Sequence, residues 1–464
     1  MRTPRAAASP RRATHSPAAP ATPMPGGAAP PALAPHLDWR RLASPSTDQP
    51  LTPAEISARV AAQLTAPTDG AALVVRPPVV IIVPDATRAT GVRAMFAGVQ
   101  AGLDRLGVDV AERRVLIAGG THRPPEATEI TALLGDRPAA GRFLVHDCRA
   151  QSGLTDRGHT RRGTPVGIAT ALFEAGTTLV IGGITGHYFA GFTGGWKGIV
   201  PGAAGYATVL ANHRLAVDPT TPGGLHPACT EGQLAGNPVH ADFVEAARRA
   251  PPPFLVNAVV GAAGAIVDLV SGPPDPAHAR GVALARRAAV PVRAPDPGAP
   301  SGAAGRPLTP ASFDLVVVET PDAGRQRDWI QSHKLVRQGA VYLRDGGTLV
   351  ARLACPDGVG SETLLDWMDV PAAELARQVA ARYTLHGHTA LAMRALCRRV
   401  RIVLVSALAP EIVRRLGMEA AVSLEEALRG AGRRLPAGAP ALWVERAGAL
   451  LPPGAPGARD LATA

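Results

Sequence analysis

A histidine and a lysine stand in one glycine-rich stretch, residues 186–202, which reads GHYFAGFTGGWKGIVPG. The imidazole of His187 can exchange a proton near neutral pH, and the amine of Lys197, once desolvated, can form a covalent bond. Lysine is rare here, because Lys197 and Lys334 are the only two among the 48 lysines and arginines of the chain. A guanidinium keeps its proton in proteins, so an arginine at this position would not serve as a nucleophile. We therefore predict covalent chemistry at Lys197; the alternative is a solvated lysine retained by chance.

Polar side chains of catalytic type also follow the strand-like runs of this part of the chain. Apolar runs at 79–83, 114–118 and 179–181 predict buried strands, and the segments between the first runs have helical character. Units of this βαβ kind form parallel sheets whose strands end at one edge, where open α/β folds bind ligands. Singly, each polar residue has a structural explanation, such as a helix cap or a surface ion pair, but their occurrence at successive strand ends favours one shared crevice. The residues expected there are Asp85, Arg88, His122, His187 and Lys197.

A second α/β unit is predicted after a segment rich in Pro, Gly and Ala. Its first strand begins at Phe313, and the following helix carries Gln331 and Lys334 on one face, three residues apart. A chain of 464 residues, 46% of them hydrophobic, is long enough for two cores. The predicted fold class is α/β, with two domains, mainly parallel sheets and an active site in the cleft between them. The predicted division is a disordered tail at 1–50, a cofactor-binding and catalytic domain at 51–290, a linker at 291–310, a second domain at 311–450 and a tail at 451–464. Met24 is an alternative start, in which case residues 1–23 are not translated.

The composition argues against several other classes of protein. The formal net charge is +11, but no basic stripe or helix with interleaved aromatic residues accompanies it, so we expect an anionic small molecule rather than nucleic acid. No apolar run reaches the ~18 residues that suggest a membrane span. The four cysteines stand far apart without a C-x-x-C pair, which is typical of a cytoplasmic protein without disulfides or zinc knuckles.

Two familiar cofactor sites fit the lysine stretch poorly. A phosphate-binding P-loop needs a serine or threonine after its lysine, where this chain has Gly198. A Schiff base between Lys197 and pyridoxal phosphate leaves His213, in the pair Asn212-His213, without a role. A metal suits His213 better, but one imidazole cannot hold a transition metal, and no spacing near it supplies the other ligands. Those ligands would then come from a cofactor.

Several motifs together resemble the nickel-dependent lactate racemase family, and the glycine-rich stretch is the most specific of them. The strongest are Asp85-x-Thr87-Arg88, Gly120-Thr121-His122-Arg123, the stretch from Gly186 to Lys197, and Asn212-His213. Moderate matches are 236–240, 277–281, Gln331-x-x-Lys334 and 357–360. The resemblance runs from about residue 75 to residue 435.

This resemblance implies a bound cofactor, the nickel-pincer nucleotide. It is a pyridinium dithio mononucleotide, tethered to Lys197, that holds nickel through one carbon and two sulfurs. His213 is the implied nickel ligand, and planar coordination by soft donors suits Ni(II). The residues expected to contact the nucleotide are Lys197, Gly191, Thr193, Gly194 and Gly195. Cofactor-maturation enzymes are the implied partners.

The resemblance also implies an isomerase that racemises or epimerises a 2-hydroxy acid by proton-coupled hydride transfer. Inversion at an alcohol carbon needs a base on each side of the substrate, and His122 and His187 would fill these roles. Arg88 would bind the carboxylate of the substrate. Asp85, Gln331 and Lys334 are the further substrate contacts expected from the motifs.

Two departures from the family pattern bear on the substrate. Ile330 stands where the lactate enzyme has an aromatic residue, and Thr389 stands where a lysine is expected. The particular 2-hydroxy acid or sugar acid is therefore left open. The alternative functions are a carrier that binds the nucleotide without turnover and a redox enzyme that uses the same cofactor.

Overall fold

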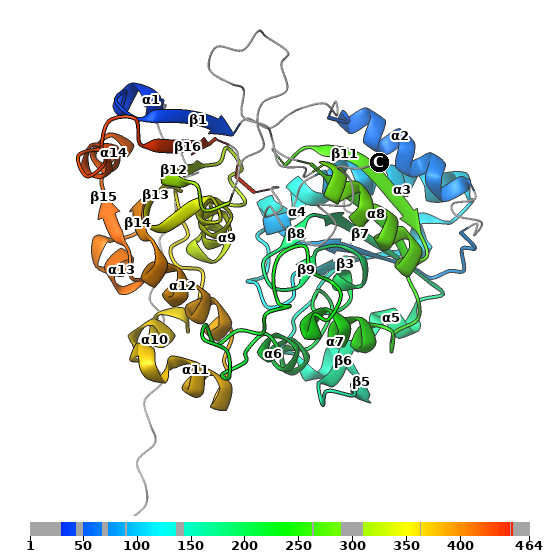
Figure 1. Cartoon of the computed structure of the whole chain (residues 1–464). Coiled ribbons are helices and arrows are strands. Elements are labelled where there is room, and N and C mark those ends of the chain that lie inside the picture. The colour runs from blue at the N-terminus through cyan, green and yellow to red at the C-terminus, as the bar shows by residue number, and fades with distance from the viewer. Residues whose placement is uncertain are drawn as a thin grey trace, which may run out of the picture.

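The chain forms two α/β units side by side (Figure 1). The computed structural model describes residues 29–42, 50–66, 73–88, 91–135, 143–261, 264–288, 310–361, 363–445 and 447–448. The predicted linker at 291–310, apart from Pro310, and the predicted tail at 451–464 lie outside the described residues.

The first unit is built on a six-stranded sheet in the order β11-β10-β7-β2-β3-β4. Its strand pairs are parallel except for β10 with β11, which is antiparallel. The strands of this sheet are β2 (Val79–Pro84), β3 (Arg113–Ala118), β4 (Phe143–Val145), β7 (Thr177–Ile184), β10 (Phe254–Val260) and β11 (Ile266–Gly272). Short hairpins are formed by β5 (Leu154–His159) with β6 (Pro165–Ala169) and by β8 (Gly186–His187) with β9 (Gly191–Phe192). The predicted strands at 79–83, 114–118 and 179–181 are confirmed as β2, β3 and β7.

Helices cover both faces of the first sheet, because each strand is apolar on both sides. In β2, Val79 and Ile81 belong to a core with the long helices α2 and α3, whereas Val80 and Ile82 belong to a core with α6 and α7. Such continuous apolar strands are typical of parallel sheets buried on both faces. The helices and helical turns of this unit are α2 (Pro53–Thr65), η1 (Ala86–Arg88), α3 (Val92–Arg105), η2 (Val110–Glu112), α4 (Ala127–Leu134), η3 (Gln151–Gly153), α5 (Ala171–Glu174), η4 (Gly195–Gly198), α6 (Tyr206–Arg214), α7 (Pro238–Ala247) and α8 (Pro274–Ala288).

The second unit is a six-stranded sheet in the order β1-β16-β12-β13-β14-β15, with all strand pairs parallel. The strands are β1 (Asp38–Leu42), β12 (Phe313–Glu319), β13 (Leu343–Arg352), β14 (Arg401–Val405), β15 (Glu419–Ala421) and β16 (Pro440–Val444). The helices are α1 (Pro30–Leu33), α9 (Trp329–Ala340), α10 (Leu364–Asp369), α11 (Ala372–Ala381), α12 (Gly387–Arg399), α13 (Pro410–Arg415) and α14 (Leu424–Gly432). Mainly parallel α/β architecture in both units agrees with the predicted fold class.

Part of the predicted disordered tail is in fact structured, so the assignment of residues 1–50 to a tail was wrong for residues 30–42. These residues form α1 and β1, and β1 extends the second sheet by pairing with β16. Leu37 and Leu42 are buried, and the indole of Trp39 donates to the carbonyl of Ala34 at 2.8 Å. With two arginines among its five residues, β1 shows no local apolar alternation that would predict a strand. It is stabilised by pairing with β16, whose residue Pro440 lies 402 positions after its partner Asp38.

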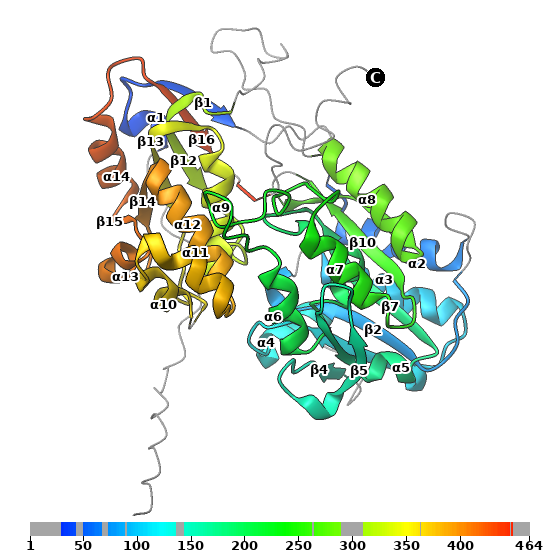
Figure 2. The ribbon, with the colours of Figure 1, turned by 60° about the horizontal axis from the view of Figure 1, so that its bottom comes forward.

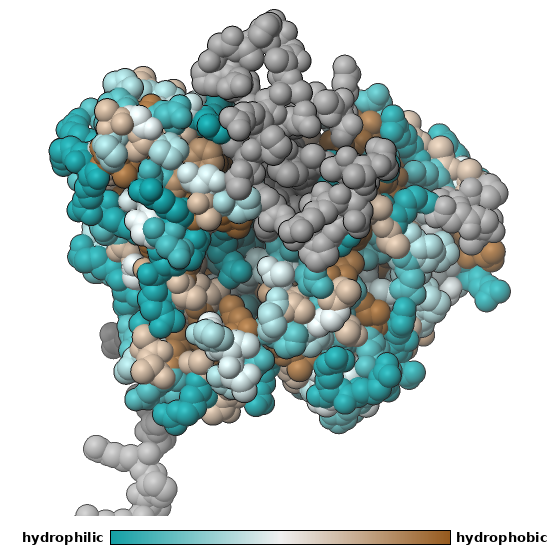
Figure 3. All heavy atoms as spheres, viewed as in Figure 1, coloured by the Kyte–Doolittle hydropathy of each residue, from teal (hydrophilic) through white to brown (hydrophobic). Residues whose placement is uncertain are grey.

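The two units touch where α6 lies beside α11 in both ribbon views (Figures 1 and 2). The turn that follows α6 packs there, since a Cβ at Gly224 would lie 2.9 Å from the Cβ of Ala376. On the face in Figure 3, hydrophobic residues show mostly as small patches among hydrophilic ones. None of the helices in the described part of the chain combines the length and the apolar character that spanning a membrane requires.

Candidate active site

A cavity of about 310 Å³ opens at the carboxyl ends of β2, β3 and β7 and is closed by α9 of the second unit. Most predicted site residues line it: Asp85, His122, His187, Thr193, Gly194, Gly195, Lys197, His213, Gln331 and Lys334. Two predicted residues are not among its lining. Gly191 instead closes the β8–β9 turn at φ +79°, where a Cβ would lie 2.4 Å from the carbonyl oxygen of Gln233. The backbone of Arg88 ends η1, and its side chain lies outside the described part of the structure.

Beyond the ends of β2 and β3, the side chains of Asp85 and His122 meet in a hydrogen bond. Nδ1 of His122 lies 2.5 Å from Oδ2 of Asp85, and the hydroxyl of Thr87 donates to Oδ1 of the same carboxylate at 2.6 Å. The Asp85 side chain is 5% exposed, and that of His122 is 30% exposed. A carboxylate only accepts, so Nδ1 of His122 carries a proton and Nε2 is the ring nitrogen left to accept one.

His187 lies in the β8–β9 hairpin and has the opposite hydrogen-bond pattern. The backbone N–H of Ala190 donates to Nδ1 of His187 at 3.2 Å. The proton of the neutral ring therefore lies on Nε2. His187 is buried and its ring is stacked on Tyr188, with 5.2 Å between the ring centroids. In this arrangement, His122 is a proton acceptor at Nε2 and His187 is a donor at Nε2.

Lys197 lies in the η4 turn and is buried, 6% exposed, in the cavity wall. Its Nζ lies 5.1 Å from the centroid of the Phe243 ring. Glycine is needed before it, because Gly195 has φ +57° and a Cβ there would lie 2.8 Å from the His278 ring. The N–H of Gly195 donates to the side chain of Asn257 at 2.8 Å, which fixes the turn. A buried, aromatic-flanked amine is a suitable place for covalent attachment.

His213, near the end of α6, is oriented by a buried polar network. Asp242 is fully buried and accepts hydrogen bonds from the hydroxyls of Thr160 and Thr164 and from Nδ2 of Asn212, at 2.6, 2.8 and 3.0 Å. With its amide nitrogen so engaged, Asn212 presents Oδ1 to Nδ1 of His213 at 3.3 Å. Nδ1 is then the protonated nitrogen, and the lone pair of Nε2 is the one suited to a metal.

These residues fit a cofactor that brings its own metal ligands. Within the described residues there is no group of three or more His, Cys, Asp or Glu side chains arranged to hold a metal ion. One oriented imidazole, His213, and one buried amine, Lys197, line the same cavity. That pair fits the tether and the single protein ligand that the resemblance implies for the nickel-pincer nucleotide.

The second unit contributes a polar face of α9 to the cavity. Nζ of Lys334 donates to Oε1 of Gln331 at 2.7 Å. The sequence reasoning missed Gln338, although it lies seven residues beyond Gln331 on the same helical face and also lines the cavity. Nε2 of Gln338 donates at 2.9 Å to Glu231 of the first unit, another cavity residue without a predicted role. Burial raises the pKa of Glu231 to about 7.

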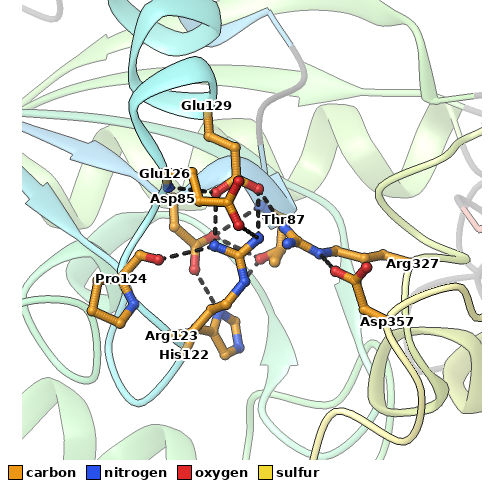
Figure 4. A network of polar contacts seen from close by, with 9 residues as sticks. All are labelled: Asp85, Thr87, His122, Arg123, Pro124, Glu126, Glu129, Arg327 and Asp357. Carbon is orange, nitrogen blue, oxygen red and sulfur yellow. Dashed lines mark hydrogen bonds and ion pairs between the residues drawn. The ribbon is translucent and has the colours of Figure 1, made fainter. Parts of the chain in front are cut away.

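Ion pairs next to His122 also join the two units (Figure 4). The carboxylate of Glu129, in α4, accepts from both ends of the Arg123 guanidinium at 2.9 Å. Arg327, just before α9, donates to the same carboxylate at 2.8 Å and pairs with Asp357. The side chains of Arg327 and Glu129 are only 18% and 20% exposed, so this link across the cleft is partly shielded from solvent.

Fold and site together define a two-unit α/β protein whose ligand cavity lies where parallel strands end, between the units. The family model described as lactate racemase N-terminal domain matches residues 42–222. The lactate racemase of Thermoanaerobacterium thermosaccharolyticum is 29% identical over 258 residues, 55% of this chain and 55% of that protein. The lactate racemase of Lactiplantibacillus plantarum is 27% identical over 347 residues, 70% of this chain and 73% of that protein. Together these matches support the lactate racemase family for this chain.

Solved structures show the same fold. The lactate racemase apoprotein from Thermoanaerobacterium thermosaccharolyticum superposes with a TM-score of 0.71 at 22% identity, covering 92% of this chain and 96% of that one. A protein from Thermotoga maritima gives a TM-score of 0.63 at 16% identity, covering 87% of this chain and 99% of that one. The sequence match with the first lactate racemase spans about half of its length.

Proposed function

We propose that this chain is an isomerase that racemises or epimerises a 2-hydroxy acid by reversible, proton-coupled hydride transfer, with a nickel-pincer nucleotide held at Lys197. The observation that carries the proposal is the presence of two differently protonated imidazoles, His122 and His187, in one cavity with a buried lysine. When bound, the nucleotide would supply a hydride acceptor that takes and returns the hydrogen of the carbinol carbon.

His122 acts as the base for one enantiomer. Its Nε2 takes the hydroxyl proton, and the carboxylate of Asp85 stabilises the imidazolium that results. This carboxylate is buried and keeps its own orientation through Thr87, so the ring of His122 is held ready for the transfer.

His187 acts on the other side of the substrate. Because the N–H of Ala190 donates to Nδ1 of His187, the proton of the neutral ring lies on Nε2. In the resting enzyme, this N–H therefore donates a hydrogen bond to the substrate oxygen. To give a proton to the new alcohol, His187 must first take up a second proton from solvent, so that it becomes a neutral imidazole again when it donates. The opposite enantiomer is processed in reverse: neutral His187 accepts the hydroxyl proton, the imidazolium of His122 returns one, and both rings regain their starting states by exchange with solvent between turnovers.

The remaining predicted residues bind cofactor and substrate. Lys197 would be the covalent tether and His213 the nickel ligand, and the turn of Thr193, Gly194 and Gly195 would lie against the nucleotide. Gly191 would support that turn from outside the cavity, through its contact with the segment 231–234. The substrate contacts would be Asp85, Arg88, Gln331 and Lys334. The last two come from the second unit, so closure of the units would exclude water from the oxo acid formed during inversion.

The test is expression together with cofactor-maturation enzymes. We expect intact-mass analysis to show added mass on the peptide of Lys197, bound nickel in the purified chain, and loss of optical activity when single enantiomers of 2-hydroxy acids are supplied. Lys197→Arg keeps the charge and should gain neither mass nor activity. A chain that gains the mass but racemises none of the acids would be a carrier, and accumulation of an oxo acid would indicate a redox enzyme; either result overturns the proposal.

A further inference from the structure

Tyr188, the residue after His187, reaches across the cleft into the second unit. Its hydroxyl lies 2.8 Å from Nε2 of His388 and 3.1 Å from Oγ1 of Thr389, both in the first turn of α12. All three side chains are buried. A hydroxyl from the loop of one unit is thus enclosed by polar groups of the other.

His388 is held on its far side as well. Its Nδ1 lies 2.6 Å from the hydroxyl of Tyr383. With a phenol at each ring nitrogen, the imidazole of His388 is satisfied when one nitrogen donates and the other accepts. Each nitrogen meets one phenol, and the chain Tyr188–His388–Tyr383 is satisfied without water.

The ring of Tyr188 links this chain to the site. It is stacked on His187, with 26° between the ring planes, and meets the His333 ring edge-on at 4.8 Å. The cations of Lys334 and Arg337 lie 5.9 and 5.5 Å from its centroid. The phenol is therefore fixed from several directions, and the imidazole of His187 is packed against a fixed surface.

The backbone before His388 is strained. His386 has φ +67°, a left-handed conformation that is unusual for a residue other than glycine. Its Nδ1 lies 2.7 Å from the hydroxyl of Ser361, which holds the ring in place. Such strain persists where surrounding contacts enforce it and is found preferentially at functional sites. The segment 386–389 is thus built to present His388 at one fixed position.

We propose that His388 is a positioning residue that acts through the hydroxyl of Tyr188 to hold His187 in place when the two units are together. The expected effect on kcat rests on the proposed function, whereas the expected effect on the order of the β8–β9 hairpin does not. The hydrogen bond joins residues of different units, so it forms only in the closed arrangement and orders the β8–β9 hairpin at that moment.

The experiment compares two changes that each remove one hydroxyl. Tyr188→Phe breaks the bond to His388 and keeps the stacked ring, whereas Tyr383→Phe leaves the Tyr188 bond intact. In the cofactor-loaded enzyme, we expect Tyr188→Phe to lower kcat about tenfold with little change in KM, and Tyr383→Phe to lower it less than about threefold. His388→Leu should match Tyr188→Phe, and His388→Gln, which retains an amide near Nε2, should recover part of kcat.

A second readout needs no activity. In the chain without cofactor, amide hydrogen exchange of residues 186–192 should be faster in Tyr188→Phe and His388→Leu than in Tyr383→Phe and the unaltered protein. Equal effects of the two tyrosine changes on kcat and on exchange would reduce His388 to a structural role and overturn the inference. If the unaltered enzyme racemises no 2-hydroxy acid, the proposed function fails, and the exchange rates alone still decide this inference.

Discussion

Nδ1 of His122 lies 2.5 Å from Oδ2 of Asp85, a carboxylate with an exposed fraction of 5% in its side chain. The two residues lie in the loops that follow neighbouring parallel strands, β2 and β3, whose register pairs Pro84 with Ala118. The contact is therefore a consequence of the sheet, and it fixes which nitrogen of His122 carries the proton.

Replacing this carboxylate by an amide should disable the base. In Asp85→Asn, the amide can donate to Nδ1 and move the proton to Nε2, so the nitrogen facing the substrate no longer accepts. We expect kcat to fall roughly 100-fold or more, by analogy with other Asp–His pairs. Polarimetry with a single enantiomer measures the loss. Thr87→Val removes only the hydroxyl that donates to Asp85 and should cost less than about tenfold; an Asp85→Asn enzyme with an unchanged kcat would exclude this role.

The ion pairs of Figure 4 predict an effect on closure of the cleft. Arg327→Gln removes the link from the second unit to Glu129, so the open arrangement should gain population. We expect KM to rise about threefold to tenfold with a smaller change in kcat, and the difference from the unaltered enzyme to shrink at high salt. Arg161→Gln, which breaks a pair with Glu245 inside the first unit, is the matched control. A rise in KM of the same size in both variants would argue against a specific link across the cleft.

The strands that carry the site were predictable, whereas the contacts between them were less so. Residues 79–83 form a run of Val and Ile that is typical of a buried strand, and the parallel arrangement then brings Asp85 near His122. The proton pattern of the two histidines was not predictable, because it depends on an amide of the β8–β9 hairpin that no sequence motif specifies.

Most side-chain contacts between the units were beyond sequence reasoning. Tyr188 and His388 lie 200 residues apart, and neither residue type demands the other. Gln338 is an exception, since its spacing from Gln331 on one helical face was visible in the sequence. Strand β1 was missed for the same reason as the Tyr188 contact, since its partner β16 is distant in sequence and its own composition resembles a loop.

Glu231 predicts a dependence of stability on pH. Burial raises its pKa from the ordinary value of 4.5 to about 7, so the folded chain keeps a proton that the unfolded chain has lost. The contribution of protonated Glu231 to the free energy of unfolding is fully present below about pH 4.5 and is lost as the pH rises through about 7. We expect Glu231→Gln to flatten the fall in Tm between pH 5 and pH 8. Glu245→Gln should leave that slope unchanged, because hydrogen bonding to the Arg161 backbone lowers the pKa of Glu245 below this range. A slope unaltered by Glu231→Gln would mean that this carboxyl titrates normally.

Removal of the first strand should destabilise the second unit. Deletion of residues 1–42 exposes the edge of β16 and the surfaces that bury Leu37 and Leu42, whereas deletion of residues 1–28 leaves α1 and β1 in place. Burial of two leucine side chains and five residues of strand pairing makes a measurable contribution, and we expect the longer deletion to lower the Tm of the second unit by roughly 5 °C. Differential scanning calorimetry of both deletions and the full chain checks this. The same Tm in all three proteins would show that β1 adds nothing to stability. A lower Tm already in the shorter deletion would assign the effect to residues before α1.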